Sequence, residues 1–166
     1  RPDEMSRDKT IWWGNPGAVN HNYISKAMVH TVPERPETFY HHSSRVQSAE
    51  PWKWIGGSGL VGLHSARVPL CGIDTARQFV VRLCFAEPEH TRPGSRVFSM
   101  ALDGQEILKD FDIFRESGGR LRTVVKEYPA VKYSGRKAGS LPAIELTFKA
   151  SAGEPLICGI EVNQAE

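Results

Sequence analysis

Glu87, Pro88, Glu89 and His90 stand at the end of an apolar run, where acidic and imidazole side chains could do chemistry. Glycoside hydrolysis needs two carboxylates flanking the scissile bond, and Glu87 and Glu89 could project together on either side of Pro88. The same residues could instead form the lip of a ligand-binding site, or lead a buried strand out of its sheet. The cluster therefore supports three hypotheses: a hydrolase, a binding site and a structural strand end.

A second polar cluster, "FYHHSSR", spans residues 39–45 and contains Tyr40, His41, His42 and Arg45. These side chains can hydrogen-bond hydroxyl groups, and Arg45 can pair with a carboxylate through two parallel hydrogen bonds. His42 or Arg45 could equally satisfy loop carbonyls, so we expect a structural role for one histidine and exposure of the other. Adjacent histidines on a strand diverge, and the sequence offers no third ligand for zinc.

Trp52 and Trp54 lie in "EPWKWIGGSG", whose glycines predict a loop. Their alternation would let both rings point one way, either toward a ligand or into the end of the hydrophobic core. Trp12 and Trp13 are consecutive and would face opposite sides of a strand, so one is expected in the core and the other is a weaker candidate.

Asp110 and Asp112 alternate in "KDFDIF", which would place both carboxylates on one face of a strand. A calcium site and an acid/base pair both use such an arrangement. Hydrogen bonds that brace the neighbouring loops are the stronger interpretation of these two residues.

The chain has 166 residues, of which 40% are hydrophobic and 24% charged, enough for one well-buried core. We expect one globular module over residues 1–166, with 1–10 a linker remnant of a longer chain. The 21 basic and 19 acidic residues are interspersed, which argues against nucleic acid as a partner, and no apolar run is long enough to insert into a membrane. Three cysteines, Cys71, Cys84 and Cys158, leave at least one thiol unpaired.

Short runs of alternating hydrophobicity dominate the second half of the chain and predict strands. In residues 78–87, Phe79, Val81, Leu83 and Phe85 share the face expected to enter the core. Asp103-Gly104 predicts a two-residue hairpin turn. The other expected strands cover residues 96–102, 105–110, 123–133 (with Pro129 at an edge or bulge), 143–150 and 156–162. These patterns predict an all-β fold, an antiparallel β-sandwich with long N-terminal loops.

The order of "VVRLCFAE", "PGSRVFSMALDGQEILKDFDIFRESGG", "VVKEYPAVKY" and "PLICGIEV" resembles the malectin and malectin-like carbohydrate-binding domains over about residues 78–162. The resemblance implies a jelly-roll-like sandwich that binds glycan without catalysis. The segment at residues 39–70 resembles the version appended to large planctomycete surface or periplasmic proteins, which implies an extracytoplasmic location and further domains in a parent chain.

The same resemblance exposes departures at the binding positions. Two neighbouring aromatic residues follow the "FAE" strand end in malectin, where this chain has Glu89 and His90. Val46 replaces another aromatic, and Gly153, beside Glu154, replaces an acidic residue. A different sugar preference is therefore expected.

We expect a non-catalytic module that binds a polysaccharide and targets its parent protein to it. Arg45 and His90 favour an acidic, uronic-acid-containing glycan. No cofactor is expected, although a structural calcium ion stays open. A protein-docking module and an enzyme using Glu87 and Glu89 are the alternatives. The expected carbohydrate-binding residues are Trp52, Trp54, Tyr40, His41, Arg45, Glu89 and His90.

Overall fold

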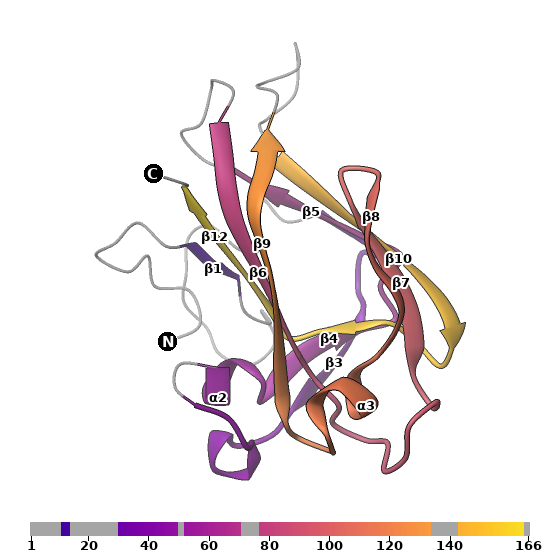
Figure 1. The fold of residues 1–166 in the computed structure, drawn as a ribbon. Helices are drawn as coiled ribbons and strands as arrows, with labels where there is room; N and C mark the ends of the chain where they lie inside the picture. Colours follow the sequence, from indigo (N-terminus) through magenta and orange to yellow (C-terminus); the bar gives the residue numbers. More distant parts are fainter. Residues whose placement is uncertain (1–10, 14–29, 50–51, 71–76, 134–142, 165–166) are drawn as a thin grey trace.

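The computed structural model describes residues 11–13, 30–49, 52–70, 77–133 and 143–164, and within them the fold is a β-sandwich (Figure 1). One sheet has the order β1 (Ile11–Trp13), β12 (Gly159–Gln164), β6 (Arg77–Ala86) and β9 (Thr123–Tyr133). The second has the order β2 (His30–Val32), β5 (Ser65–Pro69), β10 (Ala143–Ala152), β7 (Val97–Leu102) and β8 (Gln105–Asp112). All of their strand pairs are antiparallel, which confirms the predicted all-β sandwich.

A third, small sheet lies at one end of the sandwich. It consists of β11 (Leu156–Ile157), β4 (Ser58–Val61) and β3 (Glu37–Tyr40). The short helical segments η1 (Ser43–Arg45), α2 (Trp52–Ile55) and α3 (Ile113–Ser117) complete the described elements. Figure 1 shows β3, β4, α2 and α3 together at the lower end of the sandwich. The N-terminal half thus contributes a cap of short elements to the end where the β6–β7 connection lies.

The core lies between the two large sheets and is built from alternate residues of their strands. Phe79, Val81, Leu83 and Phe85 of β6 are all at most 2% exposed, which confirms the predicted core face. Phe85 crosses the interface, with its ring centroid 4.9 Å from that of Phe111 and 6.1 Å from that of Phe98, both on the opposite sheet. Edge-to-face packing of this kind stabilises beyond the burial of area alone.

Local sequence signals position the hairpin and the edge. Asp103 and Gly104 have φ angles of 48° and 83°, as a type I′ turn requires, and they join β7 to β8 as predicted. Pro129 lies in β9, an edge strand, where the register shifts between Val131 and Tyr128. The prediction of an edge or a bulge for Pro129 is therefore confirmed in both respects.

The two described cysteines are buried free thiols. Cys84 lies in β6 and Cys158 lies between β11 and β12, where its N–H donates to the Cys84 carbonyl at 2.9 Å. Cys158 also divides the expected strand at 156–162 into two. Burial raises the pKa of Cys158 to about 12 and that of Cys84 well above its ordinary value, so both remain protonated at neutral pH. Cys71 lies outside the described residues.

The loop predicted around Trp52 and Trp54 is wrong, because these residues form the helix α2. Successive helical residues are rotated by about 100°, so residues two apart point to nearly opposite sides rather than the same side. Both rings are half-buried and pack against the hydrophobic core. The expectations for the Trp12 and Trp13 side chains and for the linker at 1–10 lie outside the described residues.

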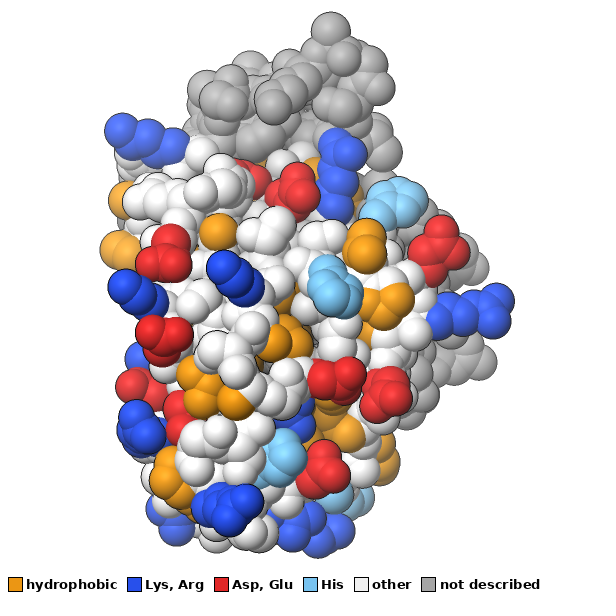
Figure 2. Space-filling view, turned by 90° about the vertical axis from the view of Figure 1, so that its right-hand side faces the viewer, with side chains coloured by type: hydrophobic (Ala, Val, Ile, Leu, Met, Phe, Trp, Pro, Cys, Tyr) orange, Lys and Arg blue, Asp and Glu red, His pale blue; other side chains and the backbone are white. Residues whose placement is uncertain are grey.

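The surface charge is mixed. On the face drawn in Figure 2, acidic and basic side chains alternate instead of gathering in one patch. None of the helices in the described part of the chain has the length or the apolar composition needed to cross a bilayer.

Replacing Phe85 by alanine should lower the free energy of unfolding by about 3–5 kcal/mol, because it removes a fully buried ring that contacts the opposite sheet. Thr147→Ala, at an exposed position of β10, should change stability by no more than about 0.5 kcal/mol. Urea denaturation followed by tryptophan fluorescence measures both. Equal stability of the two variants would contradict the assigned core.

Candidate functional site

A groove of about 610 Å³ opens at the capped end of the sandwich. This volume lies within the range of small-molecule binding pockets, ~300–1,000 Å³. We call it the β3 groove, because β3 and the residue after it form one wall. Its lining consists of Glu37, Thr38, Phe39, His41, Val61, Pro88, Glu89, His90, Arg96, Arg120, Gly153 and Glu154.

The β3 wall follows from the two-residue period of a strand. Glu37, Phe39 and His41 are two residues apart and line the groove, and Thr38 between them also lines it, whereas Tyr40 is 64% exposed and is not part of the lining. The Phe39 ring packs against the core, and its centroid is 6.2 Å from that of His41. Phe39, Val61 and Pro88 thus give the groove an apolar strip between polar groups.

Glu87 organises the opposite lip. Its side chain is 1% exposed, and Oε1 accepts hydrogen bonds from the backbone N–H groups of Glu89 and His90, both at 3.0 Å. Its other oxygen accepts from Arg96 Nε at 2.8 Å. Of the three hypotheses for this cluster, Glu87 therefore fits the structural strand end, because it accepts hydrogen bonds from loop N–H groups. The hydrolase hypothesis requires Glu87 and Glu89 to project side by side. Glu87 is instead turned inward, whereas the Glu89 side chain is 77% exposed.

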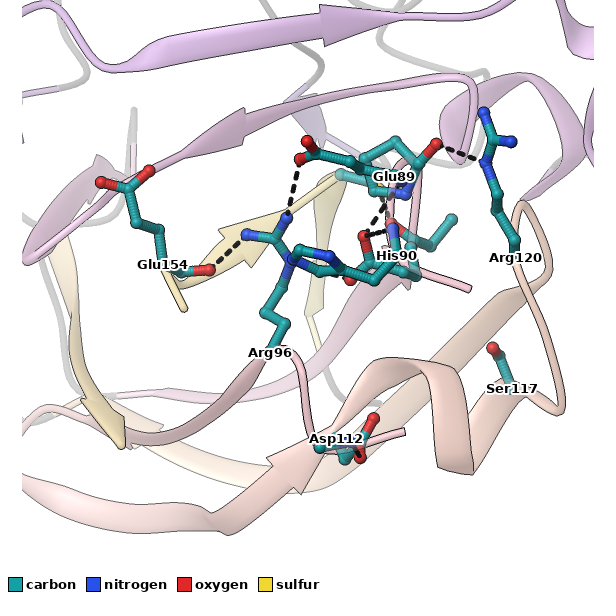
Figure 3. Close-up of polar contacts among 12 residues, drawn as sticks. Glu89, His90, Arg96, Asp112, Ser117, Arg120 and Glu154 are labelled. Atoms are coloured by element: carbon teal, nitrogen blue, oxygen red, sulfur yellow. Dashed lines mark hydrogen bonds and ion pairs between the residues drawn. The ribbon is translucent and has the colours of Figure 1, made fainter. Parts of the chain in front are cut away.

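Arg96 is a buried guanidinium on the groove lining. It is 4% exposed, pairs with Glu87 through Nε, and donates through Nη1 to the Glu154 carbonyl. Its Nη2 lies 3.9 Å from the Glu89 carboxylate (Figure 3). A buried charge is costly unless it is paired and hydrogen-bonded, and Arg96 meets both conditions through groups that also shape the groove.

The far side of the groove is cationic. Arg120 Nε donates to the Pro88 carbonyl at 2.7 Å, and Arg45 Nη1 lies 3.4 Å from Nδ1 of His41. Burial lowers the pKa of His41, and the Arg45 and Arg120 charges lower it further, against a hydrogen bond to the Pro88 carbonyl that raises it. The two guanidinium groups and the His41 ring thus lie on the same side of the groove.

Of the seven residues expected to bind carbohydrate, the groove brings together His41, Glu89 and His90. Arg45 reaches it through its contact with His41. Tyr40 faces the other side of β3, and Trp52 and Trp54 lie on α2, so these three are not part of the groove lining. Their predicted binding roles stay untested.

His42 and Asp112 have structural roles. His42 caps η1, where its Nδ1 accepts from the Ser44 N–H at 3.2 Å, so one histidine of the pair is structural and the other lines the groove. Asp112 is 4% exposed and accepts from the N–H groups of Gly94 and Arg115 at 2.6 and 3.1 Å. Asp110 is exposed beside a register shift, so the expected shared face of the two carboxylates is wrong and their bracing role holds for Asp112.

Sequence reasoning missed Phe39, Arg96 and Arg120 as groove residues. The alternation of Glu37, Phe39 and His41 could have identified the first. Arg96 and Arg120 carried no such signal, because each reaches the groove from a turn whose conformation depends on long-range contacts. Among the described residues, no group of three or more His, Cys, Asp or Glu side chains could hold a metal ion.

The family model of the malectin domain matches residues 68–160, which is more than half of the chain. The chain belongs to the malectin domain family. Malectin-like domains are generally non-catalytic binding domains, in keeping with the inward orientation of Glu87. Among curated proteins, none matches the chain in sequence.

Solved structures show the same fold at low sequence identity. The extracellular domain of ANXUR2 from Arabidopsis thaliana is 16% identical, with a TM-score of 0.69 over 91% of this chain and 44% of that one. The ANX2 ectodomain of the same plant has a TM-score of 0.63 at 16% identity, over 79% of this chain and 40% of that one. Bacteroides uniformis beta-glucuronidase is 14% identical, with a TM-score of 0.60 over 80% of this chain and 14% of that one. This chain therefore spans less than half the length of each.

Glu87→Gln should lower the free energy of unfolding by about 3–5 kcal/mol, because it leaves the Arg96 guanidinium buried without its counter-charge. Glu89→Gln is the matched control and should cost less than about 1 kcal/mol, since that carboxylate is largely exposed. Chemical denaturation of both variants gives the comparison. Similar losses of unfolding free energy in the two variants would show that the buried pair of Glu87 and Arg96 does not stabilise this side of the groove.

His41 should make the fold less stable in mild acid. Its pKa is lowered in the folded state, so the unfolded state binds the proton first as the pH falls through about 6.5. Stability should thus decrease below that pH, and His41→Gln should flatten the decrease between pH 7 and pH 5. Thermal melts across this range measure the slope. An identical slope for His42→Gln and His41→Gln would contradict the assignment to His41.

Proposed function

We propose that this domain binds carbohydrate non-covalently in the β3 groove. The observation that carries the proposal is the combination, in one groove, of an apolar strip with polar groups held in fixed positions. Sugar rings present apolar faces edged by hydroxyl groups, and they need both kinds of surface. Phe39, Val61 and Pro88 supply the strip, and Glu89, His90 and Arg96 stand beside it.

The polar groups are pre-organised for hydroxyl recognition. The Glu87 carboxylate fixes the backbone of Glu89 and His90, and it fixes the plane of Arg96 as well. Donors and acceptors that are already ordered lose less conformational freedom when a ligand binds. The proposed binding involves neither covalent chemistry nor a cofactor. Each binding experiment is repeated with a calcium chelator, and a loss of binding would indicate a structural calcium ion.

An acidic, uronic-acid-containing glycan is the proposed ligand class. Arg45 and Arg120 are exposed at one side of the groove, where a guanidinium can bind a sugar carboxylate through two parallel hydrogen bonds. In this proposal the domain acts outside the cytoplasm and brings a larger parent protein to the polysaccharide. Such appended modules act by raising the local concentration of the partner domains at their target.

Protein docking is the second candidate, and one observation favours it. Tyr40 is 64% exposed and Val32 is 55% exposed, and these are the large hydrophobic side chains most open to solvent in the described part of the chain. Tyrosine is frequent at the energetic centre of protein interfaces. A partner protein recovered in place of any glycan, and lost in Tyr40→Ala, would favour docking over glycan binding.

Phe39→Leu should weaken glycan binding about three- to tenfold, because it removes the ring while keeping apolar volume against the core. Tyr40→Ala, the neighbour on the opposite face of β3, is the control and should bind as the wild type does. Affinity electrophoresis and calorimetry over neutral and acidic polysaccharides, with circular dichroism for the fold, make the measurement.

The same panel tests the predicted roles of the two tryptophans on α2. Trp52→Ala or Trp54→Ala with intact fold and lost binding would place the sugar on α2 instead of in the groove. Absence of binding to every polysaccharide would overturn the proposed function, and release of reducing ends from a bound polymer would restore the hydrolase hypothesis.

A further inference from the structure

The β3 groove is electrically polarised along its length. At one end, His41 lies with the guanidinium groups of Arg45 and Arg120. At the other end, β4 places Val61 opposite Glu37, and a Cβ added at Gly62, the next residue, would lie 3.7 Å from the Glu154 carboxyl group. Figure 3 shows Glu154 and Arg120 on opposite sides of the Arg96 and Glu89 pair.

The charges at the two ends are not neutralised by one another. Arg45 and Arg120 form no ion pair with any carboxylate in the part of the chain that the structure describes, and the same holds for Glu37 and Glu154. Glu37 and His41 are four residues apart along β3 and the residue after it, which corresponds to about 13 Å of extended chain. That distance exceeds the Debye length of ~8 Å at physiological ionic strength, so each end acts on a ligand largely independently.

The middle of the groove holds the buried pair of Arg96 and Glu87, 2.8 Å apart, and Phe39 of β3, which stands between Glu37 and His41. Because Glu87 already neutralises Arg96, the exposed Glu89 carboxylate 3.9 Å from Arg96 adds a negative charge there. A ligand therefore meets a cationic end first, and then a wall that is partly apolar and carries the carboxylates of Glu89, Glu37 and Glu154.

We infer that the groove selects mixed oligosaccharides, in which one carboxylate-bearing sugar lies at the Arg45–Arg120 end and uncharged sugars extend toward Glu37 and Glu154. The inference rests on the proposed glycan-binding function. An acidic sugar gains a charge-assisted contact at the first end, whereas a second one at the other end meets like charges. Chains in which every sugar is acidic are thus selected against, and a mixed chain binds in one direction.

The acidic end is fixed by the backbone. Gly153, the residue before Glu154, has a φ of +61°, and a Cβ there would lie 2.5 Å from the Ser95 carbonyl. A side chain cannot be accommodated at 153 without movement of that backbone. Glu154, whose carbonyl holds Arg96, instead provides the acidic group.

The test compares three probes of equal length at low salt: neutral xylo-oligosaccharides, the same chains carrying one glucuronic acid, and fully acidic oligogalacturonides. The expected order of affinity is singly acidic, then neutral, then fully acidic, with the differences shrinking at high salt. Arg45→Gln should lower the affinity for the singly acidic probe about two- to fivefold, to that of the neutral one. Glu154→Gln should strengthen binding of the fully acidic probe by a similar factor.

Arg45→Gln is preferred to Arg120→Gln because it leaves the hydrogen bond from Arg120 to Pro88 intact. Lys149→Gln and Glu145→Gln, at exposed positions of β10, change the net charge equally without touching the groove. Equal binding of all three probes, or strongest binding of the fully acidic one, would overturn the inference while the glycan function stands. Binding of none of these probes or of any polysaccharide in the wider panel would overturn the function itself.

Discussion

The buried pair between Glu87 and Arg96 is the constraint on which the groove depends. Glu87 directly follows strand β6 and fixes two backbone N–H groups of the following loop through one oxygen. Its other oxygen holds Arg96, which in turn holds the carbonyl of Glu154. The backbone carbonyl of Glu87 also accepts from the Leu121 N–H at 2.8 Å, just beyond Arg120. One residue thus ties together the three turns that face β3.

This arrangement gives the strand-end glutamate a structural role within the malectin fold. The two positions after Pro88 are Glu89 and His90, where the family resemblance leads one to expect an aromatic pair. The aromatic ring that lines the β3 groove comes from Phe39 on the small capping sheet. In this groove the ring and the polar pair of Glu89 and His90 thus belong to different segments of the chain.

The sandwich itself could be predicted because its determinants are local and periodic. The alternation in β6, the Asp103-Gly104 turn and the edge position of Pro129 each follow from residues close together in the sequence. The groove could be predicted only in part. His41, Glu89 and His90 were found from their polarity, whereas Arg96 and Arg120 acquire their positions from partners as far apart in the chain as Glu154 and Pro88. The prediction for the tryptophans was wrong because the glycines after Trp54 suggested a loop. Trp52–Ile55 instead forms a helical turn, in which the Gly56 N–H donates to the Trp52 carbonyl.

Chemical-shift mapping by NMR during titration with an oligosaccharide that binds would locate the ligand without any mutation. If glycan binds in the β3 groove, the largest changes should fall on the backbone amides of Glu89 and His90, on Phe39 and on the Arg96 Nε–H group. Changes confined to the indole N–H groups of Trp52 and Trp54, with the groove amides unmoved, would contradict binding in this groove.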